Sequence, residues 1–69
     1  MPRTTWWFGI EDENSDLCGE EFLVEVNVPM DRAKACATKI AKENFPREKL
    51  TCYGRVGVVE AEEMGLDTY

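Results

Sequence analysis

The hydrophobic pattern changes its period in the middle of the chain. From Phe22 to Val28, apolar residues alternate with polar or mixed ones, which is the repeat of a half-buried β-strand. From Ala33 to Phe45 they recur every three or four residues, which is the repeat of an amphipathic helix. Pro29 separates the two patterns because proline has no amide hydrogen to donate to a strand. The middle of the chain is therefore predicted to be a strand that runs directly into a helix.

Further elements are predicted on both sides of this unit. The expected elements are strands at 4–10, 20–28 and 49–59, a main helix at 31–44 and a short helix at 60–64. Aromatic and β-branched residues suit the pleated surface of the first strand. Gly54 and Gly57 suggest a bulge or a close approach in the third strand. The main helix should stop before Pro46, and the short helix should end at a left-handed Gly65.

These elements define an α+β two-layer sandwich with the element order β-β-α-β and a short terminal helix. The second and third strands are joined through the helix, so they should run parallel with a right-handed crossover. The first strand should pair antiparallel with the second, and we expect the strand order 2-1-3, with 1-2-3 as the alternative. The 69 residues form one domain, and a domain of this size buries only about 60% of its unfolded surface. Self-association or a bound partner would stabilise it.

Side-chain parity divides the strand residues between two faces of the sheet. The helix-covered face should take the alternating apolar residues Phe22, Val24, Val26 and Val28. The open face should carry the candidate partner-binding residues Trp7, Leu23, Tyr53, Glu25 and Arg55. Exposed aromatic area that is rimmed by charge is typical of partner surfaces, so we expect this face to bind another protein or a second copy. The alternative is that the terminal segment, with Met64, Leu66 and Tyr69, folds over it.

Acidic and basic residues are segregated along the chain. There are 14 acidic residues, 8 basic residues and no histidine, giving a formal net charge of −6. Seven acids and no base lie from Glu11 to Glu25, and seven bases with two acids lie from Arg32 to Arg55. The candidate acidic docking patch consists of Glu11, Asp12, Glu13, Asp16, Glu20 and Glu21. This patch could bind a basic partner, whereas the simpler alternative is a solvated loop that maintains solubility.

Histidine and the recognised motifs of catalytic and cofactor-binding sites are missing. Without histidine, the usual general base for a serine or cysteine nucleophile is absent. The cysteines lack zinc-site spacing, the acidic stretch lacks the calcium-loop pattern, and no phosphate loop or dinucleotide fingerprint is present. We therefore expect no catalytic residue, metal or cofactor. Cys18, Cys36 and Cys52 are expected to be reduced cytoplasmic thiols, with a Cys36–Cys52 disulfide as the alternative. No apolar run reaches the length of a signal sequence or membrane span.

A valine-rich strand, an alanine-rich helix that ends at Phe45-Pro46 and a closing segment from Glu62 to Asp67 make up a pattern over residues 22–67. This pattern resembles small uncharacterised accessory proteins of bacterial phages and mobile elements. The resemblance implies a bacterial host cytoplasm and an accessory role, such as binding and inhibiting a nucleic-acid-binding defence enzyme. No functional residue of this chain can be assigned from the resemblance. The net charge disfavours direct nucleic-acid binding. The alternatives are an aromatic nucleic-acid platform on the sheet and a structural homodimer.

Overall fold

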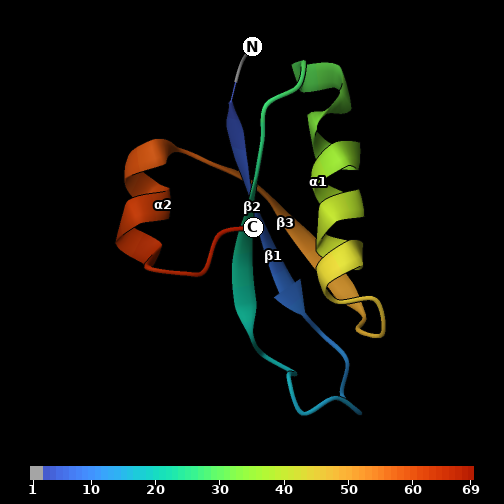
Figure 1. The fold of residues 1–69 in the computed structure, drawn as a ribbon. Helices are drawn as coiled ribbons and strands as arrows, with labels where there is room; N and C mark the ends of the chain where they lie inside the picture. The colour runs from blue at the N-terminus through green and yellow to red at the C-terminus, as the bar shows by residue number, and fades with distance from the viewer. Residues whose placement is uncertain (1–2) are drawn as a thin grey trace.

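A three-stranded antiparallel sheet organises residues 3–69, the part of the chain that the computed structural model describes. The elements are β1 (Thr4–Ile10), β2 (Glu21–Val26), α1 (Met30–Asn44), β3 (Leu50–Val56) and α2 (Val58–Met64). The strand order is β2-β1-β3, so β2 and β3 run in the same direction on either side of β1. Figure 1 shows α1 and α2 on opposite sides of the strands. The α+β class and the 2-1-3 order are confirmed.

The core forms because large side chains of the sheet meet small side chains of α1. Ala33, Ala37 and Ala41 have no exposed surface and face the apolar side chains of β1 and β2. The alanines let the helix backbone approach the sheet closely, which maintains dense packing. The apolar core residues of the two strands are Trp6, Phe8, Ile10, Phe22, Val24 and Val26. All three cysteines are free, and Cys36 and Cys52 pack against this core.

Gly57 changes the expected boundary between β3 and α2. The sequence pattern predicts a third strand that extends to Val59, but Gly57 is the extended N-cap of α2 and its carbonyl accepts from the amide of Ala61 at 2.9 Å. Val58 and Val59 therefore lie in the first turn of a helix. The helix ends as predicted, because Gly65 adopts the left-handed conformation with φ of 63°. The main helix also ends where expected, with Phe45 as its C-cap.

A β-bulge in β3 overturns the predicted position of Arg55. Phe8 pairs with Cys52, but the register then shifts, so that Trp7 pairs with Gly54 and Trp6 with Arg55. One extra residue reverses side-chain parity beyond the bulge. Arg55 is therefore on the α1 side, where its Nη1 lies 3.9 Å from the sulfur of Met30. Gly54 correctly indicates a bulge, whereas Gly57 lies outside the strand, and simple alternation along the strand does not include the effect of the bulge on parity.

The last residues form an additional short strand along β2. Thr68 makes a parallel bridge with Leu23. The amide of Leu23 donates to the carbonyl of Asp67 at 2.8 Å, and the amide of Tyr69 donates to the carbonyl of Leu23 at 2.8 Å. The amide of Glu25 donates to the carbonyl of Tyr69 at 2.9 Å. We call residues 67–69 the tail; it folds back at the edge of β2 rather than across the open face.

Candidate functional site

The face of the sheet away from α1 is only partly covered. We call this the open face, and on it Trp7 of β1 pairs with Leu23 of β2, as parity predicts. Leu23 is only 1% exposed, because α2 and the residues after it pass over this part of the sheet. Leu23 therefore cannot act as an exposed partner contact. The terminal segment covers Leu23, as the alternative expected, but it leaves Tyr53 exposed.

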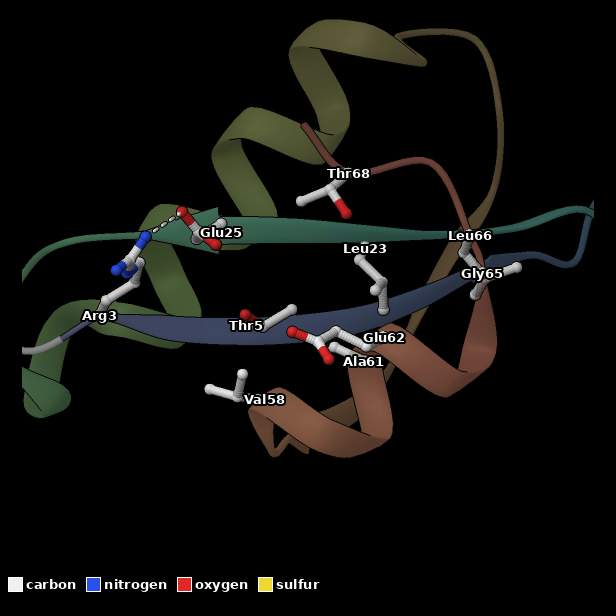
Figure 2. A pocket seen from close by; sticks show the side chains of 10 residues that line it. All are labelled: Arg3, Thr5, Leu23, Glu25, Val58, Ala61, Glu62, Gly65, Leu66 and Thr68. Carbon is white, nitrogen blue, oxygen red and sulfur yellow. Dashed lines mark hydrogen bonds and ion pairs between the residues drawn. The ribbon is translucent and has the colours of Figure 1, made fainter.

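A hollow of about 520 Å³ lies between α2 and the sheet. Figure 2 shows Leu23 and Thr5 on the sheet side, with Ala61 and Glu62 on the helix side. At one end, Arg3 Nη1 lies 3.4 Å from Glu25 Oε1, an exposed ion pair worth little in stability. The predicted site residue Glu25 thus lies beside the hollow, bonded within the chain.

Trp7 and Tyr53 form an aromatic pair on the uncovered part of the open face. Their ring centroids are 4.7 Å apart with the rings tilted by 54°. The indole Nε1 of Trp7 donates to Glu21 Oε1 at 3.2 Å, and the phenol of Tyr53 donates to Glu11 Oε1 at 3.1 Å. The Tyr53 ring lies across Gly9, where an added Cβ would be only 2.6 Å from ring carbon Cε2. The aromatic pair therefore depends on Gly9 and is held by two carboxylates.

The predicted acidic docking patch is brought together by a turn-rich loop over 11–20. The side chain of Asp12 accepts from the amide of Asn14 at 3.0 Å, and that of Ser15 accepts from the amide of Leu17 at 3.0 Å. The loop closes where the amide of Gly19 donates to the carbonyl of Ile10 at 2.9 Å. Asp12 is half-buried, and the exposed members of the patch are Glu11, Glu13, Asp16, Glu20 and Glu21. Within residues 3–69, no acidic or cysteine cluster has the geometry to hold a metal ion.

Helix α2 provides surface residues that the sequence analysis does not identify. None of its residues is buried, and Val58 and Val59 are 74% and 68% exposed. The sequence pattern places these valines in a strand because they continue an apolar run after Val56. A helix-start signal is nevertheless present in the sequence, because glycine is a favourable N-cap residue and the acidic residue Glu60 follows Gly57 within one turn.

The basic face of α1 lies apart from the open face, because the two are on opposite sides of the sheet. Its side chains Arg32, Lys34, Lys39 and Lys42 are all exposed. The basic face of α1 is therefore separated from the open face by the sheet.

We expect Tyr53 to ionise at higher pH than an ordinary tyrosine. Its hydrogen bond to the Glu11 carboxylate raises the pKa of Tyr53 above 10.0, and desolvation and the charges of Glu11 and Glu21 act in the same direction. Because the folded pKa is the higher one, the stabilising contribution is complete below pH 10.0 and is lost as pH rises through the folded pKa. Ultraviolet titration of Tyr69→Phe, in which Tyr53 is the remaining tyrosine, should show this shift.

The control for this titration is Glu11→Gln in the same Tyr69→Phe background. Glutamine retains an acceptor oxygen but removes the negative charge, so the Tyr53 midpoint should fall. Equal midpoints in the two proteins would show that Glu11 does not hold the phenol in solution.

Comparisons with known proteins provide no relative for this chain. No protein-family model, no curated protein and no solved structure matches it. In residues 3–69, neither helix combines the length and apolar character needed to span a bilayer.

Proposed function

We propose that this chain is a small, non-enzymatic protein-binding module whose main docking surface is the exposed side of α2. The observation that carries this proposal is that Val58 and Val59 are 74% and 68% exposed on a helix with no buried residue. A helix of seven residues is far too short to be stable by its own hydrogen bonds. Burial of the two valines against a partner would both stabilise α2 and provide binding free energy.

The surroundings of α2 support a protein partner over a nucleic acid. The hollow beside it is lined by apolar side chains such as Leu23, Val58 and Leu66, together with polar residues. The nearby aromatic pair is held by Glu11 and Glu21, which places negative charge where nucleic-acid bases would need to stack. Negative charge at this position repels phosphate. The nucleic-acid alternative is therefore less well supported than a protein partner.

A non-enzymatic role is supported by the chemistry of the side chains. The chain contains no histidine, and its most exposed thiol, Cys18, lies in the acidic loop. Histidine is the usual general base that activates a cysteine or serine nucleophile. Three free thiols are compatible with the reducing bacterial cytoplasm that we propose as the site of action.

A second candidate function is docking of a basic protein surface by the acidic loop. The observation that favours it is that the one ion pair within residues 3–69 joins Arg3 to Glu25, and involves none of the loop carboxylates. Such a loop could occupy the basic groove of a nucleic-acid-binding enzyme, which is the inhibitory accessory role proposed from the phage resemblance. Electrostatic docking of this kind weakens steeply with salt.

The α2 surface is tested by Val59→Glu. Glutamate is a better helix former than valine, so the variant should remain folded. We expect its affinity for the partner to fall at least about tenfold, because a charge in a buried contact must be desolvated. The measurement is capture from a bacterial lysate on immobilised protein, quantified by mass spectrometry, with Glu63→Gln on the same helix as the control.

The outcome separates the two candidate functions. The α2 surface is supported if a captured protein no longer binds Val59→Glu, still binds Glu63→Gln, and binds equally well at low and high salt. A partner lost at about 0.5 M salt and by neutralising Glu13 and Asp16, but retained by Val59→Glu, supports the acidic loop instead. Retention of every captured protein by Val59→Glu would rule out α2 as the docking surface.

A further inference from the structure

The outer edge of β2 pairs with the chain's own tail. Leu23 makes backbone hydrogen bonds with Asp67 and Tyr69, both of 2.8 Å, and the amide of Glu25 makes a third of 2.9 Å to Tyr69. The Tyr69 ring then meets the rings of Phe22 and Phe45 edge-on, with centroids 5.5 and 5.6 Å away. Backbone pairing at a sheet edge with an anchored side chain is the geometry by which sheets bind extended peptides.

Apart from the pairing with β2 and the ring contacts of Tyr69, few interactions hold the tail. It is connected to the sheet through α2, which has no buried residue and lies beside an open hollow. The three backbone bonds and the Tyr69 ring hold the tail, and the segment before it adds only half-buried side chains such as those of Ala61 and Leu66. Segments with few buried apolar contacts open locally at low free-energy cost. Opening of the tail would expose the amides of Leu23 and Glu25 as unpaired donors.

The tail and the strand with which it pairs both carry negative charge. The tail carries Asp67, and it pairs with a strand whose exposed side chains include Glu21 and Glu25. A hollow of about 180 Å³ on the α1 side of the tail is lined in part by the acidic residues Glu20, Glu21 and Asp67, and no Lys or Arg of residues 3–69 lines it. Its remaining walls are apolar, and Leu17, Phe22 and Phe45 form part of them. A site with apolar walls and an acidic rim fits the aliphatic stem and charged head of lysine or arginine.

We infer that the β2 edge binds an extended segment of a partner protein, with a basic residue in the place of Asp67 and an aromatic residue in the place of Tyr69. The partner segment displaces the tail, which occupies the site with the wrong charge. This inference rests on the proposed protein-binding role, but it uses a surface separate from Val58 and Val59. It also gives the acidic residue Glu20 a specific role, because its carboxylate binds the basic head group of the incoming segment.

The test uses the full chain with Tyr69→Ala, which removes the ring that anchors the tail. Amide hydrogen exchange at Leu23 and Glu25 should become faster in this variant, while the circular dichroism spectrum is retained. A labelled acetyl-Gly-Leu-Lys-Thr-Tyr peptide should then bind and slow that exchange again. We expect it to bind the variant at least about tenfold more tightly than wild type, because the tethered tail competes at high effective concentration.

Two matched peptides test the chemistry of recognition. Acetyl-Gly-Leu-Asp-Thr-Tyr, which has the chain's own residues 65–69, should bind the variant about tenfold more weakly than the lysine peptide at low salt, and the difference should shrink at high salt. The lysine peptide with an N-methylated tyrosine should lose binding, since it lacks the amide that replaces the Tyr69 donor. Val59→Glu should leave peptide binding unchanged, so failure here is distinguishable from failure of the α2 surface.

Three results would overturn the inference. The first is a folded Tyr69→Ala protein with fast exchange that binds neither peptide, and the second is equal affinity for the lysine and aspartate peptides. The third is wild-type protein that dimerises as its concentration rises while Tyr69→Ala stays monomeric, since the occupant would then be the tail of a second copy. If Tyr69→Ala does not fold, Tyr69→Leu replaces it, because leucine retains apolar contact with Phe22 and Phe45.

Discussion

Phe22→Ala should remove a large share of the free energy of unfolding of this protein. Phe22 is 2% exposed, and its ring centroid lies 5.6 Å from that of Phe8, 4.7 Å from that of Phe45 and 5.5 Å from that of Tyr69. Truncating a buried phenylalanine costs about 3–5 kcal/mol. A domain of this length has a free energy of unfolding of roughly 3–10 kcal/mol in total. The loss is large because one ring connects the sheet, the end of α1 and the tail.

Urea unfolding followed by far-ultraviolet circular dichroism measures this effect. Leu17→Ala is the matched control, because Leu17 is an apolar residue of the acidic loop that is 39% exposed. Its free energy of unfolding should fall by less than about 1 kcal/mol. If Phe22→Ala unfolds at the same urea concentration as Leu17→Ala, the ring cluster does not hold the three elements together.

The second large effect is expected from Ala37→Leu. Ala37 has no exposed surface and lies between Ala33 and Ala41 on the side of α1 that contacts the sheet. A leucine at this position must push the helix away from Phe8 and Phe22 or force strained rotamers. Overpacking of this kind costs about 1–3 kcal/mol, and more where the backbone has to move. The helix should separate from the sheet, and the near-ultraviolet signal of the buried aromatic rings should decrease.

Ala35→Leu is the control for this substitution. Ala35 is exposed on the same helix, and alanine and leucine have similar helix propensities, so its free energy of unfolding should stay within about 0.5 kcal/mol of wild type. Both variants are compared by thermal and urea unfolding. A stability of Ala37→Leu equal to that of Ala35→Leu would mean that the helix–sheet interface is not closely packed.

Most of the fold could be predicted because its signals are local and repeated. Alternation of apolar residues through Phe22, Val24 and Val26 specifies a strand and its buried face at the same time. The small residues Ala33 and Ala37 at helical spacing specify a helix that packs closely. Connection rules then limit the strand orders to a few, and 2-1-3 is the observed one.

The candidate site could be predicted less well, because single residues control its geometry. The extra residue at the Tyr53–Gly54 bulge moves Arg55 to the α1 side, although each residue keeps its local strand character. Gly57 converts Val58 and Val59 from an expected strand into a helix with an exposed apolar surface. Parity correctly places Trp7 and Tyr53 together because they lie before the register shift or within it.

By itself, the order of residues established the strand–helix alternation, the alanine face of α1, the acidic loop and the turn-forming role of Gly65. These features follow from local propensity and periodicity, which act over a few neighbouring residues. The three-dimensional fold alone settled that the tail pairs with β2, that Leu23 is buried and that α2 remains exposed. Those outcomes depend on contacts between residues far apart in the chain, where one inserted residue or one backbone hydrogen bond selects between surfaces of similar composition.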